Sequence, residues 1–283
     1  MQGRTISIDD VVTHYFEAGV EHKGRKPSVL LLHSAEFGGC AETSWEHNIP
    51  AFAEHYHVLA PDHLGFGLTD KVFDFNGQFN KRIRHIRRFI EAMCVDKVHV
   101  MGSSMSGGLC LTVAARTEPD WPLASVTCCS GGGDAPDNDA RKVLNTYDGS
   151  KEHMRRIVEV MFVDPKWAAD EAYIERRWKW SRAPGAWEAT AVARFKAPFP
   201  KEDDARAERN AINYGNICVP TLVFAGKLDP LRNPGYTDGF VPKIPDCRLH
   251  VFENAGHMGN IECAADFNRL CLEFLARVDQ AAS

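Results

Sequence analysis

Three polar residues stand where each could take part in nucleophilic catalysis. Ser104 follows the apolar run KVHVM, Asp229 follows the run TLVFA and His257 follows the run RLHVF. A serine becomes a nucleophile for acyl transfer when a histidine takes its proton and an aspartate orients that histidine. The three residues therefore predict a triad in which Ser104 attacks, His257 is the general base and Asp229 fixes the histidine tautomer.

The neighbours of Ser104 are the residues that a sharp turn requires. Gly102 lies two residues before the serine and Ser106 two residues after it, and an apolar stretch of helical periodicity follows. Small side chains are needed there because a strand that turns abruptly into a helix brings these two positions together. The simpler alternative is that Ser104 only caps the helix. The strand, turn and helix around it favour the nucleophile.

Asp229 and His257 also have simpler alternatives when each is taken alone. Asp229 precedes Pro230 and could be a turn residue, and His257 is one of 12 histidines and could lie on a surface loop. Asp238 and Asp246 are other acids downstream, but neither directly ends a strand-like run. The order serine, acid, histidine, each just after a buried strand, favours the catalytic interpretation because such strand ends meet at one edge of a sheet.

Two backbone N–H groups are predicted to stabilise the oxyanion. Met105 begins the helix after the serine, where N–H groups are unpaired and the helix dipole favours negative charge. The second donor is expected in the loop after the run at 28–32, and Ala35 is the predicted residue.

The elements that would position these residues alternate between strands and helices. Such alternation predicts a mostly parallel sheet with helices on both faces. Apolar runs such as SVLLL indicate strands that are buried on both faces. Eight strands are predicted, at 5–8, 12–17, 28–32, 58–60, 97–101, 124–129, 221–225 and 248–252, with helices between them at 45–54, 79–93, 105–116 and 264–278.

The alternation stops between residues 134 and 213. Helical patterns at 138–146, 151–161, 166–180 and 184–195 are separated by prolines, and no strand-like run occurs among them. We therefore expect a helical cap at 134–213, inserted between core segments 1–133 and 214–283. A cap over the carboxyl edge of the sheet would cover the place where such sheets bind ligands.

Composition excludes several classes of function. The formal net charge is −5 and no long run of lysine or arginine occurs, which argues against nucleic acid as a partner. No apolar stretch suits a signal peptide or a membrane span. The nine cysteines lack metal-ligand spacing, so neither a metal nor an organic cofactor is expected, and a reducing, cytoplasmic location is predicted.

Longer stretches of the sequence resemble one family. Residues 45–71 (WEHNIPAFAEHYHVLAPDHLGFGLTDK), 81–93 (KRIRHIRRFIEAM), 101–108 (MGSSMSGG) and 254–275 are similar to motifs of the meta-cleavage product hydrolases. These enzymes split a C–C bond in 2-hydroxy-6-oxo-dienoates during bacterial degradation of aromatic compounds. The resemblance covers most of the chain and implies the α/β-hydrolase fold, with an eight-stranded, mostly parallel sheet and an inserted helical cap.

The resemblance also implies residues that bind substrate. The family's cap carries an arginine followed by an aromatic residue, and Arg177 with Trp178 fits that position. There the arginine would hold the carboxylate or keto-enolate end of the substrate. The alternative is a solvated arginine, since Arg177 belongs to a run of charged residues at 175–179.

Other positions depart from the family pattern. His47 stands where the family has an asparagine after the loop tryptophan, Ser103 replaces an asparagine before the nucleophile, and Met258 replaces a tryptophan after the histidine. The resemblance places these three residues at the substrate. His33-Ser34 replaces His-Gly, and Glu36 replaces a glycine, as either a new polar contact or a surface charge.

Three functions follow from this sequence. The first is hydrolysis of the C–C bond of a dienoate, a small-molecule substrate. The second is hydrolysis of a small ester, which the same triad could perform because both reactions pass through an oxyanion. The third is a non-catalytic binding protein on the same fold, which an intact triad argues against. The resemblance is also compatible with a homodimer.

Overall fold

Eight strands form one sheet in the computed structural model, which describes residues 2–75, 77–194 and 212–282. The order across the sheet is β1-β2-β4-β3-β5-β6-β7-β8, and the pairs β1–β2 and β2–β4 are antiparallel while the others are parallel. All eight predicted strands are confirmed. Their bounds are β1 Gly3–Ile8, β2 Val11–Ala18, β3 Ser28–Leu32, β4 Val58–Pro61, β5 Val98–Ser103, β6 Leu123–Cys129, β7 Thr221–Gly226 and β8 Cys247–Phe252.

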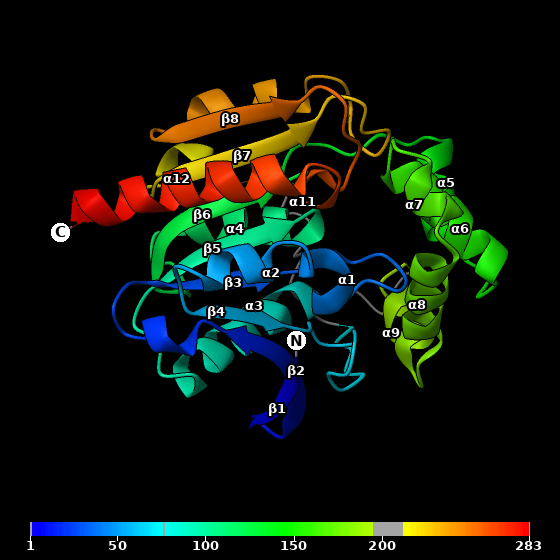
Figure 1. The fold of residues 1–283 in the computed structure, drawn as a ribbon, viewed down its shortest axis with the longest axis horizontal. Coiled ribbons are helices and arrows are strands. Elements are labelled where there is room, and N and C mark those ends of the chain that lie inside the picture. Colours follow the sequence, from blue (N-terminus) through cyan, green and yellow to red (C-terminus); the bar gives the residue numbers. More distant parts are fainter. Residues whose placement is uncertain (1, 76, 195–211, 283) are drawn as a thin grey trace.

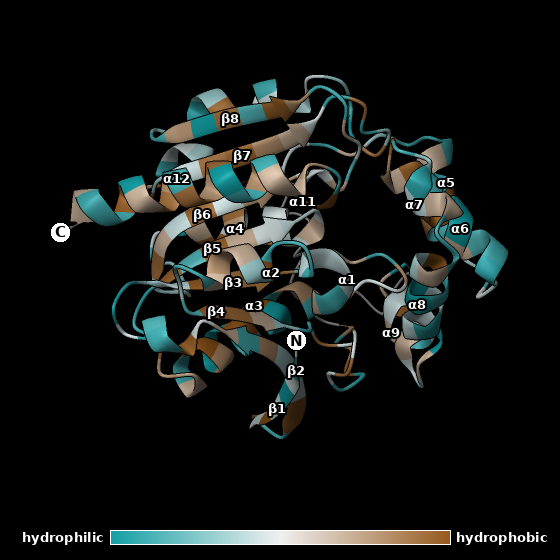
Figure 2. Ribbon diagram, viewed as in Figure 1, coloured by the Kyte–Doolittle hydropathy of each residue, from teal (hydrophilic) through white to brown (hydrophobic). Residues whose placement is uncertain are grey.

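The central strands are apolar on both faces, as the sequence predicted. In β3, Leu30 and Leu32 belong to one buried cluster while Val29 and Leu31 belong to the other. Successive side chains of a strand point to opposite faces, so a run without polar residues supplies both clusters at once. Figure 2 shows the apolar colour concentrated on these strands, whereas the outer helices alternate between apolar and polar residues.

Helices cover each face of the sheet (Figure 1). Helices α3 and α4 supply the cluster on one face, and α1, α2 and α12 supply the cluster on the other. Their bounds are α1 Ala41–Trp45, α2 Ile49–Ala53, α3 Gln78–Ala92, α4 Met105–Ala114, α11 Gly259–Glu262 and α12 Ala264–Ala282, with 3-10 turns η1 Val20–His22, η2 Tyr214–Asn216, η3 Tyr236–Gly239 and η4 Val241–Lys243. The helix predicted at 45–54 is therefore wrong in detail, because it is two short helices, the second with Pro50 in its first turn.

Between β6 and β7, the described residues form five helices that lie within the predicted cap at 134–213: α5 Asp139–Asn145, α6 Lys151–Met161, α7 Lys166–Ala169, α8 Glu171–Arg182 and α9 Ala186–Val192. The arrowheads of β7 and β8 point toward them in Figure 1. The helix predicted at 166–180 is divided at Asp170, whose side chain caps α8 by accepting hydrogen bonds from the N–H groups of Ala172 and Tyr173. The end of the predicted cap, at 195–211, lies outside the described residues.

Candidate active site

Ser104 lies on the turn between β5 and α4 with φ 53° and ψ −113°. A positive φ is uncommon for a residue with a side chain, and here it aims the serine away from both the strand and the helix. The turn is tight, because a Cβ atom on Gly102 would lie 2.3 Å from the carbonyl oxygen of Ser106. A hydrogen bond of 2.7 Å from the N–H of Ser104 to the carbonyl of Cys129 holds the turn against β6.

The structure brings the three predicted residues into one hydrogen-bonded chain. The Ser104 hydroxyl donates to Nε2 of His257 at 2.7 Å, and Nδ1 of His257 donates to Oδ2 of Asp229 at 2.7 Å. The N–H of Leu231 donates to the other carboxylate oxygen at 2.8 Å. Asp229 and His257 are buried whereas Ser104 is partly exposed.

The electrostatics keep the aspartate ionised. Burial raises the pKa of Asp229, but the charge and hydrogen bond of His257 and the N–H of Leu231 outweigh burial and lower it overall. An ionised Asp229 can fix the histidine tautomer and stabilise an imidazolium as it forms.

The N–H groups predicted for the oxyanion are available in the structure. Within the described part of the chain, neither Met105 nor Ala35 donates its N–H to an acceptor. Ser106 ties the helix to the loop that carries Ala35: its hydroxyl donates to the carbonyl of His33 at 2.5 Å and accepts from Nε2 of His63 at 2.8 Å. Ser106, which the sequence indicated only as a tolerated small residue, thus links the two halves of the predicted oxyanion hole.

The loop of His257 is fastened to the cap. The N–H of His257 donates to the carbonyl of Met161, the last residue of α6, at 2.9 Å. Glu262 accepts hydrogen bonds from the N–H of Gly256 at 2.7 Å and from that of Val163 at 2.7 Å. Burial raises the pKa of the Glu262 carboxyl. Sequence reasoning missed Glu262, because an acid that accepts from backbone groups leaves no spacing signature.

Arg177 is completely buried on α8 and already has partners. Its Nη2 donates to Oε1 of Glu36 at 2.5 Å, and its Nη1 donates to the hydroxyl of Tyr173 at 3.1 Å. Burial raises the pKa of Glu36, but the charge and hydrogen bonds of Arg177 outweigh it and lower the pKa overall. The alternative of a solvated arginine is therefore wrong, and Glu36 is the new polar contact rather than a surface charge.

The other predicted substrate residues divide into two groups. Ser103 and Met258 are buried next to the triad in sequence: the Ser103 hydroxyl has no partner among the described residues, and Met258 packs in the cluster that joins loop and cap. The structure does not bring His47 or Trp178 to the triad. The His47 side chain is 42% exposed and contacts Trp167, and Trp178 donates its N–H to the carbonyl of Gly149 on the cap.

The next residue, Asn48, is completely buried, in contrast to His47. Its amide donates to the carbonyl of Asn260 at 2.9 Å and to the side chain of Asn268 at 2.7 Å. The structure thus turns Asn48 inward and leaves His47 partly exposed.

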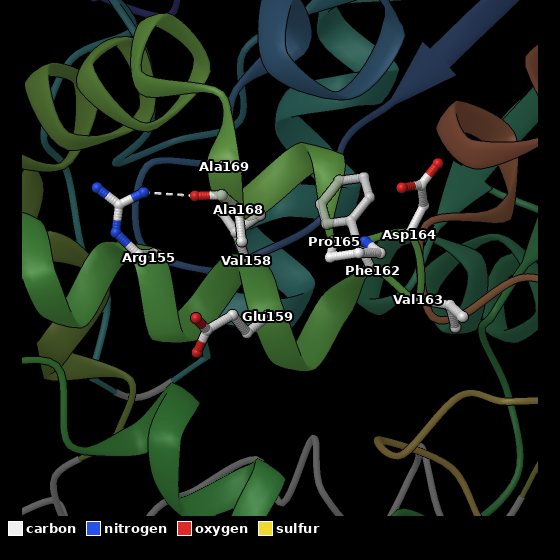
Figure 3. A pocket seen from close by; sticks show the side chains of 9 residues that line it. All are labelled: Arg155, Val158, Glu159, Phe162, Val163, Asp164, Pro165, Ala168 and Ala169. Atoms are coloured by element: carbon white, nitrogen blue, oxygen red, sulfur yellow. Dashed lines mark hydrogen bonds between the residues drawn. The ribbon is translucent and has the colours of Figure 1, made fainter.

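A hollow of about 380 Å³ lies on the cap rather than at the triad (Figure 3). It separates α6 from α7, and the Arg155 guanidinium closes one side by donating to the carbonyl of Ala168. Its lining residues are Arg155, Val158, Glu159, Phe162, Val163, Asp164, Pro165, Ala168 and Ala169. None of them belongs to the triad.

Within the described residues, no group of three or more histidine, cysteine, aspartate or glutamate side chains could hold a metal ion. In the same residues, no helix combines the length and apolar character needed to cross a bilayer.

Comparison with known proteins assigns the chain to a family. Residues 27–264 match the α/β-hydrolase fold model. The 2-hydroxy-6-oxo-6-(2'-aminophenyl)hexa-2,4-dienoic acid hydrolase of Metapseudomonas resinovorans is 33% identical over 97% of this chain and 91% of its own length. The 2-hydroxymuconate semialdehyde hydrolase of Pseudomonas sp. (strain CF600) is 29% identical, with 99% and 96% covered.

Solved structures of similar fold point to the same family. A meta-cleavage product hydrolase from Pseudomonas fluorescens IP01 superposes with a TM-score of 0.82 at 26% identity, covering 97% of each chain. A serine hydrolase involved in carbazole degradation gives a TM-score of 0.78 at 29% identity, covering 97% of this chain and 98% of that one. The chain therefore belongs to the α/β-hydrolase fold family, in the group that holds the meta-cleavage product hydrolases.

Proposed function

We propose that this protein is a serine hydrolase that cleaves the C–C bond of a 2-hydroxy-6-oxo-dienoate. The observation that carries the proposal is the continuous hydrogen-bonded chain from Ser104 through His257 to Asp229. The relatives named for dienoate and muconate semialdehyde hydrolysis supply the substrate class.

The reaction uses each group at a defined atom. After the dienol has become its keto form, Ser104 Oγ attacks the distal carbonyl carbon while His257 Nε2 takes the hydroxyl proton. The N–H groups of Met105 and Ala35 stabilise the oxyanion. Collapse breaks the C–C bond and leaves an acyl group on Ser104, and the leaving carbon fragment takes the proton that His257 Nε2 had received. Water, deprotonated by His257, then releases the acid.

Ester hydrolysis is the second candidate, and one observation favours it. The Glu36 carboxylate occupies Arg177, the residue that the sequence assigned to a substrate carboxylate. An ester without a free carboxylate needs no such cation, and it reacts through the same oxyanion.

A direct comparison of turnover tests both candidates. One arm follows loss of the yellow dienoate chromophore, and the other follows release of phenol from aryl esters. Because Ser104→Ala removes the nucleophile, it should lower either activity by about 10⁴-fold or more. Faster turnover of dienoates supports C–C cleavage, and turnover of esters alone supports an esterase. Turnover of neither, together with no labelling of Ser104 by a phosphonate, would leave the non-catalytic alternative.

A further inference from the structure

Arg177 and Glu36 form a deeply buried ion pair. The exposed fractions of the two side chains are 0% and 4%. Arg176, the next residue of α8, pairs with Glu46, and there the fractions are 37% and 20%. A buried ion pair is costly to form and costlier to break by removing one partner. The pair joins the loop that carries the predicted oxyanion donor Ala35 to the cap helix α8.

Helix α8 has further contacts with acids of the core. Glu46 and Glu42 bind Arg176 and the indole N–H of Trp180 at 2.5 and 2.9 Å. They are the outer contacts of the same helix. Glu36 differs from both because it is buried and directly follows Ala35, the predicted oxyanion donor.

The loop of Glu36 is shaped around its side chain. A Cβ atom on Gly39 would lie 2.9 Å from Oε1 of Glu36, and one on Gly38 would lie 2.4 Å from the carbonyl oxygen of Arg177. Gly38 also has φ +76°, which side chains rarely adopt. Glu36 directly follows Ala35, the predicted oxyanion donor. The packing of Gly38 and Gly39 and the bond to Arg177 thus hold the carboxylate in place, one residue after the predicted oxyanion donor.

The charges around Glu36 decide what can bind. Arg177 donates to it directly. Among the described residues, Arg194 also interacts with its charge; the Arg194 guanidinium carbon lies 4.5 Å from the centre of the Phe37 ring, and its Nη1 donates to the carbonyl of Thr190. A substrate carboxylate at Arg177 must either displace Glu36, which would leave a buried carboxylate unpaired, or sit next to it as a like charge. Both are unfavourable.

We propose that Glu36 is a specificity-determining residue whose carboxylate occupies Arg177, so that the site binds a substrate carboxylate weakly and favours substrates with an uncharged ester or ketone oxygen there. The inference rests on the proposed hydrolase function and sets the charge of the preferred substrate. A dienoate would accordingly be turned over with a high KM.

Two substrates that differ only in charge test the proposal: the mono-p-nitrophenyl ester of glutaric acid and its methyl-capped diester. The measured quantity is the ratio of kcat/KM for the acid over that for the capped substrate. Glu36→Gln should raise this ratio about tenfold or more, because it leaves Arg177 uncompensated. The matched control Glu46→Gln removes a more exposed acid from the same helix contact and should leave the ratio unchanged. An unchanged ratio in folded Glu36→Gln overturns the proposal.

A double variant covers the case in which Glu36→Gln does not fold. Glu36→Gln with Arg177→Met removes both buried charges, a change that proteins often tolerate. If Glu36 already withholds Arg177 from substrate, the ratio should stay within about twofold of wild type. A fall of about tenfold would mean that Arg177 serves the substrate carboxylate in the wild type, and the proposal would be wrong.

A binding measurement separates this proposal from the proposed function. Monomethyl glutarate, which carries one carboxylate, should raise the melting temperature of Glu36→Gln more than that of the wild type, and dimethyl glutarate should not. If no ester or dienoate is hydrolysed, the hydrolase function fails, while the melting experiment still decides the role of Glu36. Equal shifts in both proteins would contradict that role.

Discussion

Two buried groups of charged side chains, one at the edge of the sheet and one on the face of α8, are arranged differently. At the sheet edge, Asp229 and His257 continue to Ser104, which is partly exposed. On α8, Arg177 pairs with Glu36, and both side chains are buried. The first arrangement is a chain with an open end, and the second is a closed pair.

This difference distinguishes residues that catalyse the reaction from residues that determine which substrate binds. A chain that ends at an exposed hydroxyl can pass a proton to or from a substrate. A closed ion pair carries no net charge, so it can influence which substrate binds but cannot transfer a proton. Substitutions at the sheet edge should therefore change rate, whereas substitutions at closed contacts should change stability or preference.

The largest effect is expected for Asp229→Asn. An amide at this position keeps an oxygen for the N–H of Leu231 but presents N–H to the histidine, which favours the wrong tautomer. We expect kcat to fall by about 10⁴-fold while the melting temperature changes little. Comparable losses of rate and stability would mean that the acid is a structural rather than a catalytic partner.

A smaller loss of rate is expected for Glu262→Ala. Without the carboxylate, the N–H groups of Gly256 on the histidine loop and of Val163 on the cap lose their common acceptor. The resulting small displacement of His257 should lower kcat by about 10²-fold. Glu253→Ala is the matched control, because Glu253 lies on the same loop but pairs with Lys227 in solvent. Equal effects of the two substitutions would remove the proposed link between cap and base.

Asp62 is a closed contact of the core and should affect stability instead of rate. Its carboxylate accepts from the N–H of Ala41 at 2.8 Å, from that of Leu68 at 3.0 Å and from Nδ1 of His14 at 2.7 Å. Asp62→Asn loses acceptors for these donors and should cost about 1–3 kcal/mol of unfolding free energy, read by urea unfolding at pH 7. A loss of activity without a loss of stability would contradict the comparison.

The pH dependence of this effect has a defined sign. Burial raises the pKa of Asp62, but hydrogen bonds and the charges of His14 and His33 lower it below its usual value of 3.8. A carboxyl with a lowered folded pKa stabilises the protein above pH 3.8 and loses that contribution as the pH falls through the folded pKa. The difference in unfolding free energy between wild type and Asp62→Asn should therefore decrease as the pH falls. A difference that increases would argue against an ionised Asp62.

The smallest effect is expected for Arg176→Ala. Arg176 pairs with Glu46 where both side chains reach solvent, and such pairs contribute about 0–1 kcal/mol. The melting temperature and the preference between charged and uncharged substrates should both remain close to wild type. A shift in preference as large as that of Glu36→Gln would show that the whole face of α8, rather than the closed pair, selects the substrate.

The strands and the positions of Ser104, Asp229 and His257 were predictable because each depends on local sequence. A continuous apolar run predicts a doubly buried strand, and the residue after it lies at the sheet edge whatever the rest of the chain does. The interruption of the strand–helix alternation predicted the cap, the family resemblance added its arginine, and comparison with known proteins confirmed the family.

Contacts between distant segments were not predictable in the same way. Glu36 and Arg177 are 141 residues apart, and no spacing rule links a glutamate in one loop to an arginine on a cap helix. His47 was assigned from the family resemblance, and a match of motifs does not determine which of two neighbouring residues faces inward. Trp178 follows Arg177, and neighbours on a helix point in directions about 100° apart, so the arginine could face the core while the tryptophan faced the cap.

The hydrogen bond from the N–H of His257 to the carbonyl of Met161 attaches the backbone of the catalytic base to the cap. A cap that lifted away as one body would release the backbone of the residue that must deprotonate the serine. Substrate entry is therefore compatible with a working enzyme only while the end of α6 stays docked. On heating, activity should accordingly disappear with the local melting of α6, before the sheet unfolds.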